Sequence, residues 1–84
     1  INAERLQRVG AAEAWLRQRG FQELRVRSQG ETARIEVPPS ALHRLVEEPT
    51  RSAVVEALLA LGFSAVSLDL EGLVSGKLNR ALKR

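Results

Sequence analysis

The apolar positions at the start of the chain recur at the spacing of an α-helix. Residues 3–19 place one apolar stripe on one side when they are wound at 3.6 residues per turn. The stripe consists of Leu6, Val9, Ala12 and Leu16. Gly20 follows, where a glycine in the left-handed conformation ends many helices. The pattern therefore predicts an amphipathic helix over residues 3–19.

Two runs of strict alternation come next, over residues 23–28 and 32–37, and they predict a β-hairpin. A two-residue turn at Gln29 and Gly30 places Val26 opposite Ala33. This register brings the two apolar faces onto the same side, as a half-buried hairpin requires. The apolar positions of the two runs are Leu24, Val26, Ala33, Ile35 and Val37.

The polar face of this hairpin carries three arginines. The same register puts Arg25 directly opposite Arg34, with Arg27 beside them. Like charges across a strand pair are destabilising, so this face needs negative charge. Two interpretations are open. Either Glu23 and Glu36 supply the charge diagonally, or the guanidinium groups hold a phosphate or carboxylate ligand.

The second half of the chain predicts two more helices, a third strand and a tail helix. They are a short helix before Pro49, a second helix that ends at Gly62, a strand over residues 65–70, and a tail helix around Leu78 and Leu82. The order α-β-β-α-α-β-α predicts an α+β fold. The hairpin and the third strand form a small sheet, with helices packed on one face.

Composition limits the size and chemistry of this fold. The chain has 84 residues, which allows one small domain. It has no cysteine and one histidine, which excludes disulfides, a cysteine nucleophile and a zinc site built from histidines. Thirteen basic residues face ten acidic ones, and eleven of the thirteen are arginine, the residue suited to forked contacts with phosphate.

The ends of the chain and its apolar runs indicate its setting. No apolar run approaches the roughly 20 residues that span a bilayer, and no signal peptide is visible, so we expect a cytoplasmic protein without a membrane partner. The chain begins with Ile1, not Met, so we expect it to be a segment of something longer. A domain of this size gains stability from oligomerisation or from a covalent neighbour.

No catalytic motif is complete in the sequence. His43 has no serine or cysteine partner and is interpreted as a surface residue. Asp69 and Glu71 stand two residues apart at the end of the third strand, where they either bind Mg²⁺ or pair with arginine. Such a pair falls short of a metal site, and we predict no metal ligand.

Two alternatives to a ligand-binding enzyme domain follow from the same features. The arginine excess favours a basic nucleic-acid-binding module. The aromatic residues Trp15, Phe21 and Phe63 stand at core positions, however, which leaves no stacking platform for bases. The other alternative is a structural interaction domain that binds no ligand.

Several short segments together carry a resemblance to a known family over nearly the whole chain. They resemble the C-terminal portion of the ATP-dependent sacrificial sulfur transferases, PP-loop enzymes that make the pyridinium-based nickel-pincer nucleotide cofactor. The segments are Leu24-Arg25-Val26-Arg27, Gly30, Ala33-Arg34-Ile35-Glu36-Val37, Gly62-Phe63, Leu68-Asp69-Leu70-Glu71-Gly72 and Ser75-Gly76 with Asn79.

The resemblance implies that residues 1–84 are a single C-terminal domain of a longer PP-loop protein, whose N-terminal ATP-binding domain is absent from this chain. ATP and Mg²⁺ are expected in that absent domain, and no cofactor is expected in this segment. The implied reaction converts a carboxylate of a pyridinium mononucleotide to a thiocarboxylate after adenylation by ATP. The sulfur donor is a cysteine in some members and an iron–sulfur cluster in others. The implied partners are the N-terminal PP-loop domain, further copies of the chain and a nucleotide-like substrate.

The resemblance also implies site residues. The family binds the substrate phosphate with two arginines that match Arg25 and Arg27, and a further arginine matches Arg19. A helical glutamate matches Glu13 as a supporting residue. The hairpin register adds Arg34 to the phosphate site, and the strand end adds the pair Asp69 and Glu71 as support.

The chain departs from the family pattern at three positions. Leu73 and Val74 stand where the family has Tyr and Arg, and Gln29 replaces a histidine before the hairpin glycine. Because the missing arginine lies near the family's active site, the departure bears on which substrate the chain accepts.

Overall fold

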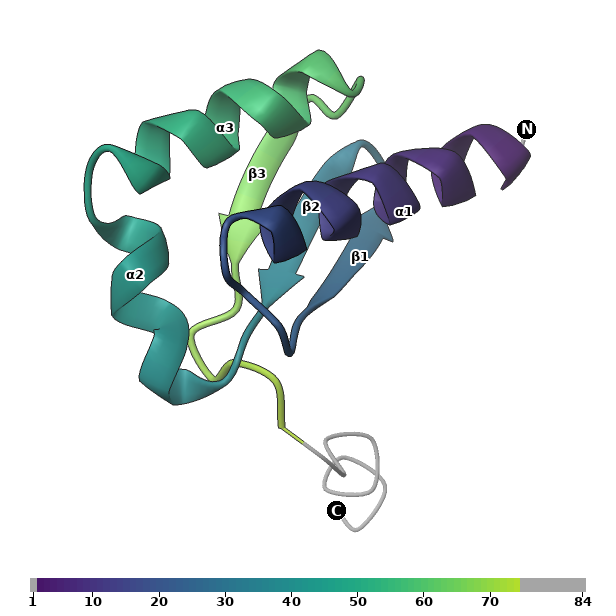
Figure 1. Ribbon diagram of the computed structural model, residues 1–84. Coiled ribbons are helices and arrows are strands. Elements are labelled where there is room, and N and C mark those ends of the chain that lie inside the picture. Colours follow the sequence, from purple (N-terminus) through teal and green to yellow (C-terminus); the bar gives the residue numbers. More distant parts are fainter. Residues whose placement is uncertain (1, 75–84) are drawn as a thin grey trace, which may run out of the picture.

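The computed structural model describes residues 2–74 and confirms an α+β fold (Figure 1). The predicted order holds from the first helix to the third strand, with a short 3-10 helix (η1) added before the second helix. The tail helix predicted around Leu78 and Leu82 lies outside the described residues. The elements are α1 (Asn2–Gln18), β1 (Arg25–Gln29), β2 (Thr32–Glu36), η1 (Pro39–Ala41), α2 (Leu42–Val46), α3 (Thr50–Ala60) and β3 (Ala65–Leu68).

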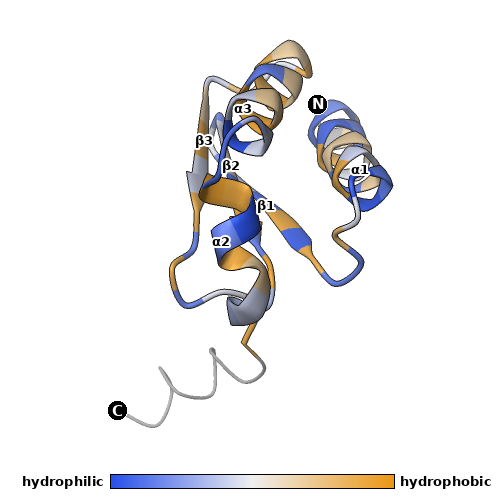
Figure 2. Cartoon of the chain, turned by 60° about the vertical axis from the view of Figure 1, so that its left-hand side comes forward, coloured by the Kyte–Doolittle hydropathy of each residue, from blue (hydrophilic) through white to orange (hydrophobic). Residues whose placement is uncertain are grey.

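The three strands form one mixed sheet in the order β1-β2-β3. β1 and β2 pair antiparallel, and β2 and β3 pair parallel. The parallel pairing needs a long crossover, which α2 and α3 supply. Helix α1 packs against β1, and α3 packs against β3. Figure 2 shows both helices on the same side of the sheet, as predicted, so neither helix covers the opposite face.

The core lies between the sheet and these helices. The predicted apolar face of the hairpin is buried, with Val26, Ala33 and Ile35 each at most 3% exposed. Leu16 of α1 and Leu58 of α3 are fully buried against it. Alternation within the strands therefore identified the correct core face. None of the helices within residues 2–74 is long and apolar enough to cross a membrane.

The predicted hairpin register is wrong by two residues. Val26 pairs with Ile35 instead of Ala33, and Arg34 stands opposite Arg27 instead of Arg25. The turn residues are Gly30 and Glu31, with Gly30 at a φ of 59°. A two-residue hairpin turn of type II′ needs positive φ at its first central position, which glycine supplies there. A shift of two residues leaves every side chain on its predicted face.

The structure also differs from the prediction at Leu6, which was placed in the apolar stripe of the first helix, and at the end of the third strand, which was placed at residue 70. Leu6 is 71% exposed, because α1 spans roughly 25 Å while each strand of the hairpin spans about 17 Å. The first turns of α1 consequently extend past the sheet (Figure 1). Leu70 is 83% exposed, because β3 ends at Leu68 and the chain turns at Asp69.

Candidate functional site

The face of the hairpin away from the helices carries a cluster of arginines around one buried glutamate. Arg27 and Arg34 stand directly opposite each other on β1 and β2. Glu36, which is 3% exposed, lies between them diagonally. Arg34 Nη2 donates a hydrogen bond to Glu36 Oε2 at 3.1 Å, and Arg27 Nε lies 3.6 Å from Glu36 Oε1. The diagonal pairing predicted for Glu36 is confirmed.

Arg34 has a second acidic neighbour at the end of β3. Parallel pairing with β2 brings Asp69 close, and Arg34 Nε lies 3.9 Å from Asp69 Oδ2. That separation is too long for a hydrogen bond, and among residues 2–74 Arg34 Nε is a buried donor without an acceptor. Of the two alternatives for the acidic pair, the structure bears out ion pairing for Asp69. Glu71 is exposed, and its backbone N–H donates to Asp69 Oδ1 at 2.9 Å.

Arg25 lies on the same strand face, opposite Glu36 in the register. It is exposed, and within residues 2–74 it takes part in no ion pair. Within the described residues, Arg27 and Arg34 therefore pair with Glu36 and Asp69, while Arg25 is exposed and without an ion pair. An exposed guanidinium beside two others is suited to attracting an anion.

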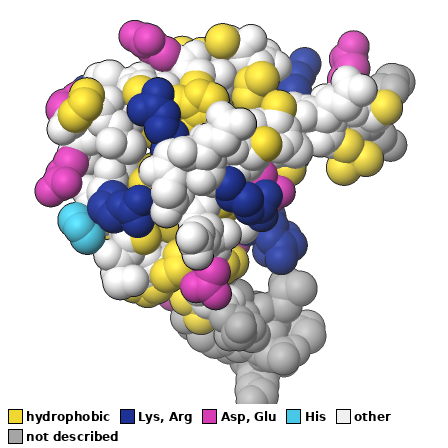
Figure 3. Space-filling view, viewed as in Figure 1, with side chains coloured by type: hydrophobic (Ala, Val, Ile, Leu, Met, Phe, Trp, Pro, Cys, Tyr) yellow, Lys and Arg dark blue, Asp and Glu magenta, His cyan; other side chains and the backbone are white. Residues whose placement is uncertain are grey.

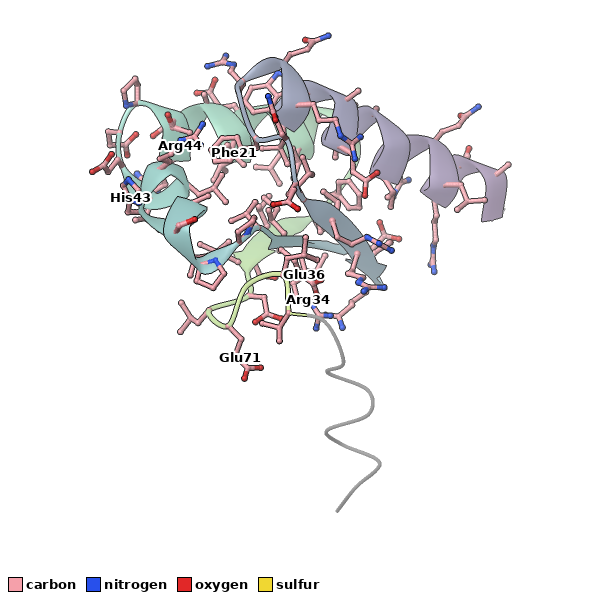
Figure 4. The ribbon with its side chains drawn as sticks, turned by 60° about the horizontal axis from the view of Figure 1, so that its bottom comes forward. Phe21, Arg34, Glu36, His43, Arg44 and Glu71 are labelled. Atoms are coloured by element: carbon pink, nitrogen blue, oxygen red, sulfur yellow. The ribbon has the colours of Figure 1, made fainter. Side chains whose placement is uncertain are left out.

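A pocket of about 420 Å³ opens on this face and is called the arginine pocket here. One side is polar and comes from the hairpin, and the other is apolar and comes from the chain after β3. Figure 4 shows Arg34 and Glu36 side by side beneath the sheet, with Glu71 directed away from them. The lining residues are Arg27, Ser28, Gln29, Arg34, Glu36, Leu73 and Val74.

The structure places Glu13 on the opposite side of the hairpin from the arginine pocket. Its Oε2 accepts a hydrogen bond of 3.1 Å from the backbone N–H of Val26, at the unpaired edge of β1. Arg17 Nη1 lies 4.0 Å from Glu13 Oε1. Glu13 thus fixes the strand that carries Arg25 and Arg27. Its influence on the site passes through the backbone.

Arg19 follows the last residue of α1, and its guanidinium carbon lies 4.5 Å from the centroid of the Trp15 ring. This stacking position gives Arg19 a structural partner. The described residues give it no contact with the arginine pocket, so its part in a phosphate site stays a prediction.

The remaining candidates do not gather into a second site. His43 is exposed and lies far from the Arg34 side chain in Figure 4. Phe21 and Phe63 are each 3% exposed, which confirms their core assignment. On the side drawn in Figure 3, basic side chains are interspersed with acidic and apolar ones, so they form no continuous basic surface there. Neither observation favours a nucleic-acid interface.

From the sequence, Leu73 and Val74 were noted as departures from a family pattern, and their place in the pocket wall was not predicted. A turn signature in the sequence could have indicated that these two residues return to the sheet. Asp69 accepts hydrogen bonds from two backbone N–H groups, those of Glu71 and Gly72, and the following residue returns to the sheet through the bond from Leu73 N–H to Val37 O. An aspartate followed by a glycine three positions later is a turn signature.

Comparisons with known proteins place this site in context. No protein-family model matches the chain. All 84 residues match an uncharacterized protein of Synechocystis sp. at 46% identity. All 84 residues also match the pyridinium-3,5-bisthiocarboxylic acid mononucleotide synthase of Lactiplantibacillus plantarum, at 38% identity. This chain is similar along its whole length to part of that synthase.

The similarity to the synthase has a defined extent. The chain spans 31% of the length of the Synechocystis protein and 30% of the length of the synthase. The identity supports the resemblance to the enzymes of nickel-pincer cofactor synthesis that the sequence segments indicated.

Proposed function

We propose that this chain is the substrate-phosphate-binding and oligomerisation domain of a sulfur transferase in nickel-pincer cofactor synthesis. The whole-chain match to a synthase of a pyridinium bisthiocarboxylic acid mononucleotide supports the reaction class. The substrate class is then a pyridinium mononucleotide, and its phosphate is the group that this chain binds.

One observation carries the phosphate assignment. Arg27 and Arg34 face each other across the hairpin, and a single buried carboxylate lies between them. The ion pair of Arg27 with Glu36 joins Nε to Oε1 at 3.6 Å, and the Arg27 side chain is 49% exposed, so a ligand can reach it from solvent. A phosphate held there completes the charge balance and gives the guanidinium its forked contact.

Each residue of the face then has a separate part. Arg27 and Arg25 bind the phosphate oxygens from adjacent outward positions on β1. Glu36 and Asp69 hold Arg34, which contributes charge from β2. Glu13 keeps β1 in place through the N–H of Val26. We keep Arg19 as a further candidate ligand of the phosphate and Glu71 as a supporting residue.

The sulfur chemistry requires groups that this chain does not supply. Adenylation of the substrate carboxylate requires an ATP-binding PP-loop with Mg²⁺, and transfer requires a sulfur donor, while the 84 residues contain no cysteine. We assign both to the N-terminal domain of a longer protein, in which this chain binds and orients the nucleotide in the cytoplasm.

The phosphate assignment is tested by titrating the full chain with a matched pair of probes. Nicotinate mononucleotide carries the phosphate, and nicotinate riboside is the same molecule without it. We expect the mononucleotide to shift the backbone amide NMR signals of residues 25–36, and the riboside to leave them in place. Equal binding of the two probes contradicts the proposal, as does an absence of any binding.

A substitution identifies the residue. Arg27→Gln removes a forked contact with the phosphate, and such charge-assisted contacts contribute about 1.5 kcal/mol or more, which is roughly a tenfold loss of affinity. Arg5→Gln is the control, because it makes the same change of charge on the exposed outer part of α1. If the two variants bind equally, the attraction is a property of net charge and Arg27 has no direct part.

Oligomerisation is tested by sedimentation equilibrium of the chain. The exposed apolar side chains Leu6, Val46 and Leu59 offer surface for such contacts, at 71%, 56% and 44% exposure. We expect a concentration-dependent increase in mass. A strict monomer at millimolar concentration counts against this part of the proposal, and assembly without phosphate binding favours a structural interaction domain.

A further inference from the structure

The arginine pocket has two walls of opposite character. Arg27 and Arg34 supply cationic groups from the hairpin, while Leu73 and Val74 supply aliphatic groups from the chain after β3. Its volume of about 420 Å³ exceeds what a phosphate ion needs and falls within the range of pockets for small organic molecules. A free anion would satisfy one wall and leave the other in water.

The apolar wall is held in a fixed position. Asp69 N–H donates to Ile35 O at 3.0 Å, Gly72 N–H donates to Asp69 O at 3.0 Å, and Leu73 N–H donates to Val37 O at 2.8 Å. The first and third bonds tie the two ends of the turn to Ile35 of β2 and to Val37, the residue after β2, and the second closes the turn itself. The turn is therefore anchored to the same strand that carries Arg34.

Gly72 makes this close return possible. Its φ is 82°, which side chains rarely tolerate, and a Cβ there would lie 2.5 Å from the carbonyl oxygen of Val37. The backbone approaches Val37, directly after β2, this closely because residue 72 is glycine. Leu73 is half-buried in consequence, and Val74 is 40% exposed along the rim of the pocket.

We propose that Leu73 and Val74 determine the specificity of the pocket for phosphate monoesters whose organic part presents an apolar or aromatic face. The proposal rests on the phosphate contact with Arg27 described above. The phosphate lies against the arginines, and the face of the ring packs on the two aliphatic side chains. Burial of aliphatic and ring surface supplies the added affinity.

The predicted preference follows from the contacts. A ring that covers these side chains removes apolar surface from water, and each buried methylene contributes about 0.8 kcal/mol, or close to fourfold in affinity. Ribose 5-phosphate carries the same phosphate and sugar without the ring. We therefore expect nicotinate mononucleotide to bind about tenfold more tightly than ribose 5-phosphate.

The experiment measures the dissociation constants of both probes by NMR titration of the full chain. Leu73→Ala and Val74→Ala are each expected to weaken binding of the mononucleotide about threefold and to leave ribose 5-phosphate unchanged. Leu70→Ala is the matched control, because Leu70 belongs to the same turn, is 83% exposed and does not line the pocket. Val74→Ala removes a side chain that is already partly exposed, so it is the informative variant if Leu73→Ala disturbs folding.

The outcomes separate this proposal from the phosphate assignment. Suppose that Arg27→Gln weakens binding of both probes, while the Leu73 and Val74 variants weaken binding of neither probe or of both probes equally. The specificity proposal is then overturned and the phosphate assignment stands. If the wild-type chain binds the two probes with constants within twofold of each other, the specificity proposal is likewise overturned. If Arg27→Gln changes nothing, both proposals fail.

Discussion

Replacing Glu36 by glutamine removes the buried charge that separates Arg27 from Arg34. The carboxylate is 3% exposed and lies 3.1 and 3.6 Å from nitrogens of the two arginines. The substitution keeps the shape of the side chain and one hydrogen-bond acceptor. It leaves two guanidinium groups opposite each other with Asp69 as the remaining counter-charge near Arg34.

The magnitude follows from the geometry. Unit charges of opposite sign about 4 Å apart attract each other by about 4 kcal/mol at an effective dielectric constant of 20, and by about 1 kcal/mol in water. Arg34 is 32% exposed, so its pair with Glu36 is taken near the higher energy. Arg27 is 49% exposed, so its pair is taken near the lower one, and together the two pairs contribute roughly 5 kcal/mol before desolvation. The cost of burying the carboxylate offsets part of this. We expect Glu36→Gln to lower the free energy of unfolding by about 2–3 kcal/mol.

An anion distinguishes this explanation from a general loss of packing. If the arginines lack a counter-charge in Glu36→Gln, sulfate or phosphate replaces it and restores stability. At ten times its dissociation constant, a ligand that binds only the folded state adds about 1.4 kcal/mol. Urea unfolding monitored by circular dichroism, with sodium chloride at equal ionic strength as the reference, measures the recovery.

Glu31→Gln is the matched control. Glu31 pairs with Arg8 at 3.0 Å, but its side chain is 52% exposed, and such surface pairs contribute about 1 kcal/mol or less. If Glu36→Gln is no less stable than Glu31→Gln, or if sulfate stabilises both variants equally, the account of the arginine face is refuted.

Three further substitutions test other parts of the account. Glu13→Ala removes the acceptor for the Val26 N–H and is expected to lower the free energy of unfolding by about 1.5 kcal/mol. It is also expected to speed hydrogen exchange at that amide, and unchanged exchange would refute the edge contact. Gly72→Ala is expected to cost at least about 2 kcal/mol and to expose the Leu73 amide to exchange, because alanine is strained at positive φ, and a protected amide would contradict this. The hydroxyl of Ser52 lowers the pKa of Glu48 below the ordinary value of a glutamate, so its stabilisation is present at neutral pH and is lost as the pH falls through that lowered pKa. A carboxyl NMR titration of Glu48 checks this, and an ordinary pKa in the wild-type chain, or a pKa unaltered by Ser52→Ala, would contradict it.

The sequence was sufficient for the fold because the strands have a strict period. Alternation assigns each side chain to a face regardless of an even shift in register. The arginines and the core residues were therefore predicted on the correct faces, even though the predicted register was shifted by two residues. The turn decided that shift. Glycine can adopt positive φ at either central position, and the sequence alone did not indicate which position Gly30 takes.

The site was predictable only in part, because half of its wall comes from a segment that leaves the regular pattern. The end of β3 at Leu68 depends on the hydrogen bonds of Asp69, whereas the alternation of apolar residues in the sequence continues to Leu70.

The burial of Leu6 could not be predicted from the sequence of its helix. It depends on how far the sheet extends beneath that helix, which is a property of the tertiary structure.

The most direct test of the central claim is the ratio of the dissociation constants of nicotinate riboside and nicotinate mononucleotide, measured by NMR titration of the full chain. Binding of the phosphate by Arg27 and its neighbours predicts that the mononucleotide binds at least tenfold more tightly, with the largest amide shifts in residues 25–36. A ratio near one, or shifts that centre on another part of the chain, would contradict the claim.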